Sequence, residues 1–211
     1  GGPHSQMVTN SWLSGGWFLH YMAQKGYIVF TLDNRGTNYR GFEFESCIHR
    51  RLGDLEVEDQ MCGVTYLKSL DFVDTNRLSI DGWSYGGFMT MSMFLRHPGV
   101  FNRASCGGPV IDWKYYEVMY GERYMDTPQE NPDGYKKASL LNYVDSLEGK
   151  LLIFHGALDP TVVWQNTLQF IDKSIKAQKQ VDYFIYPTHG HNVGGFDRVH
   201  LWKKIENFHA Y

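Results

Sequence analysis

Apolar residues along the chain follow two alternating patterns: short apolar runs, and longer segments in which apolar residues recur every three or four positions. The short runs predict β-strands, and the longer segments predict helices with one apolar face. The predicted strands cover residues 27–32, 78–82, 151–154 and 181–186, and the predicted helices cover residues 54–70, 86–97, 164–175 and 199–208. This alternation is typical of an α/β fold with a mostly parallel sheet and flanking helices.

Local signals mark where several of these elements begin and end. Residues 27–32 form a continuous apolar run, as expected of a strand buried on both faces, and the turn sequence Asp-Asn-Arg-Gly follows at residues 33–36. Asp54 is expected to cap the helix that follows. Pro98 ends the helix predicted at residues 86–97, because proline cannot continue a helix.

One long connection interrupts the regular order. Residues 109–148 are rich in Tyr and Pro and show little periodicity. A segment of this length exceeds an ordinary connection within a compact domain. We therefore interpret it as a functional insertion.

Composition narrows the classes of protein that fit. The 211 residues are enough for one domain, and an apolar share of 43% can fill a sizeable core. The formal net charge of −3 lacks the basic excess that would attract nucleic acid. Every apolar stretch is far shorter than the roughly 18 to 20 residues of a membrane span, so no transmembrane segment is expected. Cys47, Cys62 and Cys106 allow at most one disulfide and form no zinc-binding pattern.

The first chemical motif lies between a predicted strand and a predicted helix. Residues 82–86 read Gly-Trp-Ser-Tyr-Gly and match the Gly-x-Ser-x-Gly nucleophile elbow, in which a tight turn exposes a reactive serine. A side chain at Gly82 or Gly86 is expected to collide with the neighbouring backbone of that turn. The motif in this context makes Ser84 a candidate nucleophile.

Candidate partners for Ser84 follow in the order that the elbow predicts, first an acid and then a histidine. Asp159 follows the strand predicted at residues 151–154, and His191 follows the strand predicted at residues 181–186. His191 would take the proton of Ser84, and Asp159 would hold the imidazole in the right tautomer. His189 is the competing base, and a metal site formed by His189, His191 and Asp159 is the competing chemistry.

The other histidines are expected to play ordinary surface or packing roles. His155 ends a predicted strand but precedes the acid in the chain, which is the wrong order for the base. The remaining six lie in predicted loops or helices away from strand ends: His4, His20, His49, His97, His200 and His209.

The sequence resembles the prolyl oligopeptidase family of serine peptidases, and within it the dipeptidyl peptidase IV branch. The elbow Gly-Trp-Ser-Tyr-Gly-Gly at residues 82–87 carries the resemblance, together with the segments at residues 1–6, 33–36, 50–53, 56–60 and 113–125. The segment Trp113 to Met125 is the most specific, because generic esterases have no such insertion. The match covers nearly the whole chain and implies the α/β-hydrolase fold.

The resemblance also implies a binding pocket and an oxyanion site. The pocket would hold the proline or alanine before the cut bond, since aromatic faces pack well around a flat apolar ring. The backbone N–H of Tyr85 would be one oxyanion donor. The residues that would line the pocket are Tyr85, Val110, Trp113, Tyr116, Tyr120 and Val162.

Three departures from the family pattern limit what this chain does alone. The family's second oxyanion donor is a tyrosine that would precede Gly1, and losing one donor typically costs about 100 to 1,000-fold in turnover. The paired glutamates that bind a substrate's free amino group in this branch lie in a separate β-propeller, and no Glu-Glu pair occurs here. Thr161 stands where a close relative would have asparagine.

We therefore expect residues 1–211 to be an incomplete α/β-hydrolase catalytic domain that lacks the first strands of its sheet, with a β-propeller upstream in the parent protein. The predicted reaction is release of X-Pro or X-Ala dipeptides from peptide substrates through an acyl-enzyme on Ser84, with no metal or other cofactor. An endopeptidase or acylaminoacyl peptidase of the same family, an esterase or lipase, and a non-catalytic binding homologue are the alternatives.

Resemblance alone suggests two further properties. A periplasmic, secreted or membrane-anchored parent is expected. Homodimerisation is expected through the last strand and the helix that ends at Tyr211.

Overall fold

The computed structural model describes residues 3–4, 6–12 and 16–210 of the chain. Over these residues the strands are β1 (Ser79–Trp83), β2 (Arg103–Gly107), β3 (Lys150–Gly156) and β4 (Asp182–Tyr186). The α-helices are α1 (Gly16–Gln24), α2 (Phe42–Ser46), α3 (Leu55–Lys68), α4 (Tyr85–Arg96), α5 (Val118–Met125), α6 (Pro132–Ala138), α7 (Gln165–Lys176) and α8 (Asp197–His209). Two 3₁₀ segments, η1 (Trp113–Tyr115) and η2 (Leu140–Ser146), complete the described elements.

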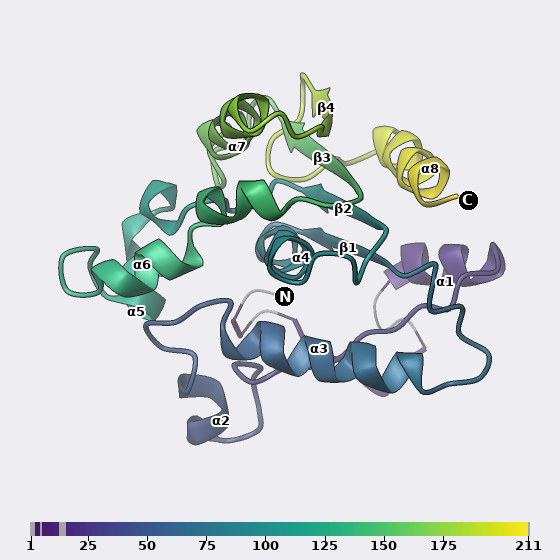
Figure 1. Cartoon of the computed structure of the whole chain (residues 1–211), viewed down its shortest axis with the longest axis horizontal. Coiled ribbons are helices and arrows are strands. Elements are labelled where there is room, and N and C mark those ends of the chain that lie inside the picture. The colour runs from purple at the N-terminus through teal and green to yellow at the C-terminus, as the bar shows by residue number, and fades with distance from the viewer. Residues whose placement is uncertain (1–2, 5, 13–15, 211) are drawn as a thin grey trace.

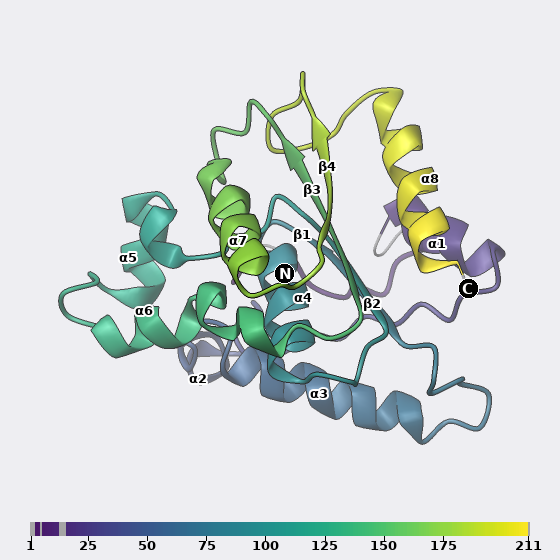
Figure 2. The ribbon, with the colours of Figure 1, turned by 45° about the horizontal axis from the view of Figure 1, so that its top comes forward.

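The four strands form one parallel sheet in which spatial order equals chain order, β1-β2-β3-β4. Connections between neighbouring parallel strands are almost always right-handed, so winding in a single direction places the connecting helices on one face. Accordingly α4 and α7 lie on one face of the sheet, and α8 covers the other together with α1 (Figures 1 and 2). This is the mostly parallel sheet with flanking helices that the sequence pattern predicts, and it fits the α/β-hydrolase fold that the family resemblance implies.

Strand β3 shows how both faces of the sheet are filled. Leu151 and Ile153 join the larger core cluster, which includes the buried side chains of α4. Leu152 and Phe154, which point to the opposite face, pack in a second cluster with Leu201 of α8. A continuous apolar run is the expected pattern for a strand covered on both faces.

Most predicted elements are confirmed to within a few residues. Strands 78–82, 151–154 and 181–186 correspond to β1, β3 and β4, and helices 54–70, 86–97, 164–175 and 199–208 correspond to α3, α4, α7 and α8. The segment expected as an insertion lies between β2 and β3 and contains α5, α6 and the two 3₁₀ segments. The three cysteines are free thiols.

Strand β2 is one element that the hydrophobic pattern does not reveal. Its sequence is Arg-Ala-Ser-Cys-Gly, and only Ala104 and Cys106 are apolar. Both side chains are nevertheless fully buried, because β2 lies between β1 and β3 and is covered by helices on its two faces. Small side chains suit this crowded central position.

The strand predicted at residues 27–32 is wrong. These residues have no regular secondary structure, and Ile28, Val29, Phe30 and Leu32 are exposed. A strand needs a hydrogen-bonded neighbour, and residues 27–32 pair with none of the described strands. The segment instead crosses α3, where side-chain atoms of Leu32 and Phe30 lie 2.9 and 3.0 Å from where a Cβ would stand on Gly63.

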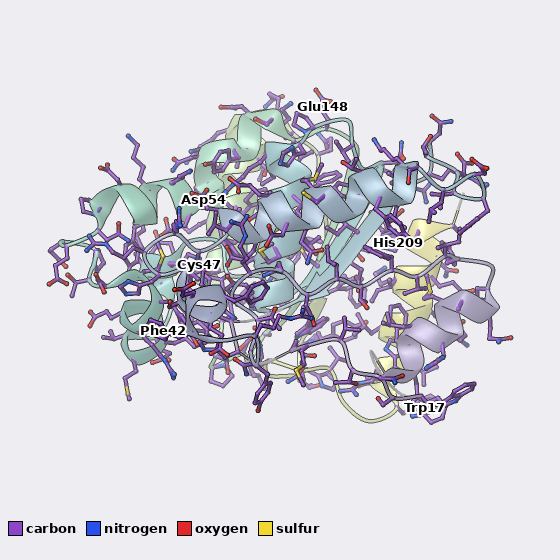
Figure 3. All side chains as sticks on the ribbon, turned by 90° about the horizontal axis from the view of Figure 1, so that it is seen from below. Trp17, Phe42, Cys47, Asp54, Glu148 and His209 are labelled. Carbon is purple, nitrogen blue, oxygen red and sulfur yellow. The ribbon has the colours of Figure 1, made fainter. Side chains whose placement is uncertain are left out.

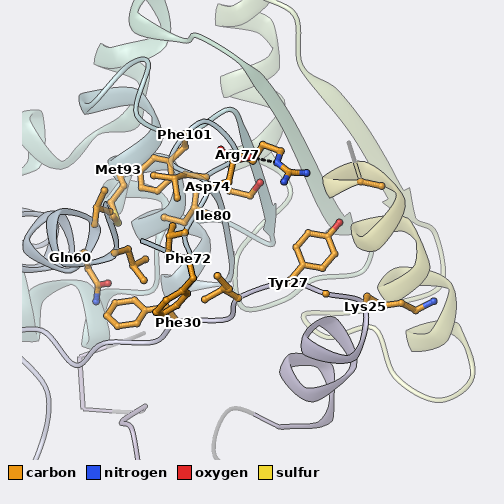
Figure 4. A pocket seen from close by; sticks show the side chains of 18 residues that line it. Lys25, Tyr27, Phe30, Gln60, Phe72, Asp74, Arg77, Ile80, Met93 and Phe101 are labelled. Carbon is orange, nitrogen blue, oxygen red and sulfur yellow. Dashed lines mark hydrogen bonds and ion pairs between the residues drawn. The ribbon is translucent and has the colours of Figure 1, made fainter. Parts of the chain in front are cut away.

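A cavity of about 590 Å³ separates this segment from β1 (Figure 4). It runs along the outer edge of the sheet, on the side of β1 that faces away from β2. On that side β1 pairs with none of the described strands. Its walls are largely apolar and include Tyr27, Phe30, Phe72, Ile80, Met93 and Phe101.

Asp54 precedes α3 as expected, but its side chain does not cap the helix. The Asp54 carboxylate lies 2.5 Å from Lys137 Nζ and 3.6 Å from Arg96 Nη1. The Asp54 carboxylate thus pairs with two cations. Just before the helix, the N–H of Gly53 donates to Glu56 Oε2 at 3.0 Å.

Helix α1 packs on α8, although the two are far apart in the sequence (Figure 1). Phe18 lies 5.5 Å from Trp202 between ring centroids. The Glu206 carboxylate accepts a hydrogen bond from Tyr21 and forms an ion pair of 3.1 Å with Lys25.

Among the described residues, no helix is long and apolar enough to cross a membrane.

His209, in the last turn of α8, forms a buried polar contact with the sheet (Figure 3). Its Nε2 lies 2.8 Å from Ser105 Oγ, and that hydroxyl donates to the carboxylate of Asp81. The Ser105 oxygen therefore accepts the Nε2–H of His209. Burial, reinforced by the positive charge of Arg103, lowers the pKa of His209 to about 4.

This lowered pKa predicts acid sensitivity. Between about pH 6.5 and 4 the unfolded chain binds a proton at His209 that the folded chain does not, so the free energy of unfolding falls as the pH falls through this window. His209→Gln keeps an N–H donor for Ser105 but does not titrate. Denaturant unfolding at pH 7 and pH 4.5 should show that the original protein loses about 2 kcal/mol more than the variant. Equal losses would mean that His209 is not the group responsible.

Candidate active site

Four loops meet at the carboxyl edge of the sheet, because all four strands run in the same direction. Ser84 directly follows β1, Gly108 follows β2, Asp159 follows β3 and His191 follows β4. Ligand and catalytic sites of open parallel sheets lie at this edge. The three candidates Ser84, Asp159 and His191, which are widely separated in the sequence, thus come from adjoining loops.

The turn at Ser84 is strained. Its backbone has φ 60° and ψ −116°, a conformation that residues other than glycine rarely adopt. The N–H of Ser84 donates to Gly107 O at 2.7 Å, which ties the turn to the end of β2. Such a turn holds a serine above the end of the sheet at the start of a helix, as the elbow motif predicts.

The two glycines of the motif differ in their surroundings. A Cβ on Gly82 would stand 2.2 Å from Gly86 O, so no side chain fits there. A Cβ on Gly86 would meet nothing within 4 Å. The expectation that both positions exclude a side chain is therefore wrong for Gly86, because its hydrogens point into open space while its carbonyl faces Gly82.

The two candidate bases have different partners. His191 Nδ1 lies 2.8 Å from Asp159 Oδ2, whereas His189 Nε2 lies 2.8 Å from Asp197 Oδ2. The backbone carbonyl of His191 accepts a hydrogen bond of 2.8 Å from Trp83 Nε1, next to Ser84. The geometry therefore favours His191 over His189 as the partner of Asp159.

Gly108 gives the imidazole and the carboxylate room to meet. A Cβ on Gly108 would stand 3.4 Å from both Asp159 Oδ2 and His191 Cε1, and its φ of +48° further favours glycine.

Ser84 Oγ makes no hydrogen bond among the described residues. Hydrogen bonds between catalytic groups are often long when no substrate is bound. Over the same residues no group of three His, Cys, Asp or Glu side chains is arranged to hold a metal ion.

The Asp159 carboxylate is fully buried and well supplied with donors. Burial by itself would raise the pKa of this carboxyl, but hydrogen bonds outweigh it and hold the pKa well below its ordinary value. The donors are the side chains of His155 and His191 and the backbone N–H groups of Val162 and Thr161. Asp159 is therefore an anion that can stabilise a positive charge on His191.

Helix α4 begins at Tyr85, immediately after Ser84. The first N–H groups of a helix have no partner within it and carry a partial positive charge. The Tyr85 N–H, expected as an oxyanion donor, is the first of this set.

Some predictions fall on residues that the structure does not describe. Residues 1–2, 5 and 211, which include part of the amino-terminal family motif and Tyr211, lie outside the described residues.

The residues expected to line the pocket belong to one apolar cluster. Trp113 lies at its centre: its ring is 5.7 Å from Tyr85, 5.4 Å from Tyr116 and 5.8 Å from Tyr120 between centroids, and it is parallel to Tyr120 within 7°. Val110 and Val162 are buried in the same cluster. These aromatic contacts are well suited to a flat apolar ligand, and they also fill the core.

Sequence reasoning missed Glu56, which it gave no role in the site. Its side chain is buried, and Oε1 accepts a hydrogen bond of 2.5 Å from the hydroxyl of Tyr85. Burial raises the pKa of Glu56, although the hydrogen bonds from Tyr85 and from the Gly53 N–H act against it. Glu56 thereby fixes the ring that follows Ser84.

His155 was also missed, because it precedes the acid in the chain. It is fully buried, and its Nε2 lies 3.4 Å from Asp159 Oδ2. The only sequence signal that could have indicated it is its place at the end of a strand directly before the acid-bearing loop.

A family model described as "Prolyl oligopeptidase family" matches residues 12–211. The chain belongs to the prolyl oligopeptidase family. Dipeptidyl peptidase 8 of Mus musculus is 36% identical over 92% of this chain, and dipeptidyl aminopeptidase B of Saccharomyces cerevisiae is 37% identical over 97% of it. The match spans only 22% and 26% of the length of these two relatives.

Solved structures of this family agree with the fold. A candidate dipeptidyl aminopeptidase IV of Bacteroides ovatus is 53% identical and superposes with a TM-score of 0.96 over 99% of this chain and 30% of that one. Dipeptidyl peptidase 4 of Porphyromonas gingivalis is 37% identical, with a TM-score of 0.90 over 98% of this chain and 30% of that one. The chain therefore spans less than a third of the relatives that it matches.

The two glycines of the elbow provide a matched test of the turn. Gly82→Ala should lower the free energy of unfolding by about 2 to 3 kcal/mol, because the new Cβ collides with the Gly86 carbonyl. Gly86→Ala should change it by less than about 1 kcal/mol, since the position is helical and open. Denaturant unfolding of both variants measures the difference, and equal losses would contradict the geometry.

Proposed function

We propose that the complete protein is a serine peptidase that releases dipeptides with proline or alanine in the penultimate position. The observation that carries the proposal is the hydrogen bond between Asp159 and His191 Nδ1 at the sheet edge where the strained turn presents Ser84. The names of the relatives, dipeptidyl peptidases and dipeptidyl aminopeptidases, support the reaction class.

The proposed reaction is acyl transfer in two halves. Because Nδ1–H of His191 donates to Asp159, Nε2 is the nitrogen free to accept a proton. Ser84 Oγ attacks the carbonyl carbon, its proton passes to His191, and the buried anion of Asp159 stabilises the imidazolium. His191 then gives that proton to the leaving amine, and the C–N bond breaks to leave an acyl-serine. Water, deprotonated by His191, hydrolyses this ester and releases the dipeptide.

The developing negative charge on the substrate oxygen would be met at the amino end of α4. The N–H of Tyr85 supplies one hydrogen bond there. A second donor, the tyrosine expected before Gly1 from the family resemblance, would come from outside this chain.

The cluster around Trp113 is proposed as the pocket for proline or alanine. Its rings meet both edge to face and in parallel, and Tyr116 and Tyr120 are only partly buried, so these two rings are the part of the cluster that a ligand can reach. The exposed residues Val118 and Met119 at the start of α5 lie in the same insertion and would border the entrance.

We further propose that β1 is not the edge of the sheet in the complete protein. Two observations support this: the apolar cavity beside β1, and residues 28–32 on its far side, whose apolar sequence is strand-like although they belong to none of the described strands (Figure 4). An added strand would pair with the free edge of β1 and cover Phe30 and Ile80. An upstream β-propeller, a homodimer and a periplasmic, secreted or membrane-anchored parent remain predictions from the family resemblance.

The nucleophile is tested by Ser84→Ala in the complete protein, assayed with a Gly-Pro anilide. The variant should lose about 10⁴-fold or more in kcat, because no other group forms the acyl-enzyme. A fluorophosphonate should label the original protein at Ser84 and leave the variant unlabelled. Turnover by the variant close to that of the original protein would refute the assignment.

The substrate class is tested by comparing Gly-Pro anilide with its N-acetylated form. Cleavage of only the free-amine substrate is expected, since the dipeptidyl branch binds the substrate's amino group. Equal cleavage of both would instead assign an endopeptidase or acylaminoacyl peptidase with the same catalytic residues. Cleavage of simple acyl esters alone would assign an esterase.

A further inference from the structure

His155 lies at the end of β3, and its fully buried ring is in contact with three functional groups. Nδ1 is 2.7 Å from the hydroxyl oxygen of Thr167 on α7. Nε2 is 2.8 Å from the carbonyl oxygen of Val162 and 3.4 Å from Oδ2 of Asp159. The ring thus connects the helix, the proposed pocket and the candidate acid.

These contacts determine where the hydrogen of the ring stands. A carbonyl oxygen only accepts hydrogen bonds, so the nitrogen facing Val162 must carry the hydrogen. In the neutral ring Nδ1 is then the acceptor, and the hydroxyl of Thr167 donates to it. The Nε2–H of His155 is directed at the Val162 carbonyl, with the Asp159 carboxylate as its second neighbour.

The same ring stabilises the loop that bears the acid. Within this loop the N–H groups of Thr161 and Val162 donate to Asp159 Oδ1 at 2.8 and 2.9 Å. His155 holds the same residue from its other backbone group, the carbonyl of Val162. A shift of Val162 would therefore move its own N–H away from the Asp159 carboxylate and displace the neighbouring donor, Thr161.

The Asp159 carboxylate is left with a defined orientation. Its Oδ1 is occupied by the two backbone donors, and its Oδ2 faces His191 at 2.8 Å and His155 at 3.4 Å. A buried carboxylate with so many donors stays charged and cannot rotate without losing several of them.

We propose that His155 is a positioning residue that directs Asp159 Oδ2 towards His191 and keeps Val162 in place in the pocket. The proposal rests on the proposed function of the site. His155 touches no substrate in it; it acts through the acid and through the loop.

Two substitutions at this position separate the roles of the two nitrogens. In His155→Gln the side-chain amide reaches the place of Nε2, so its N–H can donate to Val162 and face Asp159. In His155→Asn the shorter amide reaches only the place of Nδ1, so it can bond Thr167 but leaves Val162 and Asp159 without that donor. Both variants are neutral and polar, which makes them matched controls.

The first measurement is steady-state cleavage of Gly-Pro anilide by the complete protein. His155→Asn should lower kcat by about 10 to 100-fold and raise KM, because a misplaced catalytic group costs about this much and the pocket wall moves too. His155→Gln should retain most of both parameters. Thermal unfolding of each variant shows whether a loss of activity merely follows a loss of stability.

The second measurement, which does not depend on turnover, is the ¹H NMR signal of the His191 Nδ1–H, assigned with a His191→Gln variant. Loss of a donor leaves more negative charge on Asp159 facing His191 and strengthens the hydrogen bond between them. The signal should therefore move downfield in His155→Asn and stay in place in His155→Gln.

The outcomes separate this proposal from the proposed function. If Ser84→Ala leaves turnover intact but His155→Asn moves the His191 Nδ1–H signal, the peptidase assignment fails and the positioning role stands. If Ser84→Ala abolishes turnover but neither variant moves that signal, or both lose activity only in step with stability, the positioning role is overturned.

Discussion

The parallel direction of the four strands is the constraint on which the candidate site depends. Because β1, β2, β3 and β4 all end at the same edge, the loops after them meet, and residues separated by more than a hundred positions become neighbours. Single-direction winding places α4 and α7 on one face and leaves the other face for α8 (Figure 2). Reversal of any one strand would carry its loop to the opposite edge.

Buried polar groups add a second level of order at this edge. A carboxylate buried without partners is costly, so Asp159 and Glu56 each require donors that only a particular arrangement supplies. Asp159 receives them from its own loop and from two histidines, and Glu56 receives them from Tyr85 and the Gly53 backbone. The polar contacts therefore specify how the loops and the aromatic cluster are oriented, beyond what apolar packing decides.

The apolar cavity beside β1 marks a place where apolar side chains are not covered. The apolar side chains of residues 28–32 remain exposed, although their sequence is as strand-like as that of β3. The difference is hydrogen bonding: β3 lies between two strands, whereas residues 27–32 are separated from β1 by the cavity. A strand is thus a property of a pair of segments rather than of one.

The sequence by itself determined the α/β class, the places of β1, β3 and β4, and the candidate residues Ser84, Asp159 and His191, because apolar periodicity and motif order are local properties. Only the tertiary structure decided that residues 27–32 form no strand, that β2 exists, that Gly82 but not Gly86 excludes a side chain, and that His191 rather than His189 faces Asp159. It alone also revealed Glu56 and His155. These outcomes depend on which groups meet across loops distant in sequence, and hydrogen-bond partners and close approaches of that kind leave no mark on the local pattern.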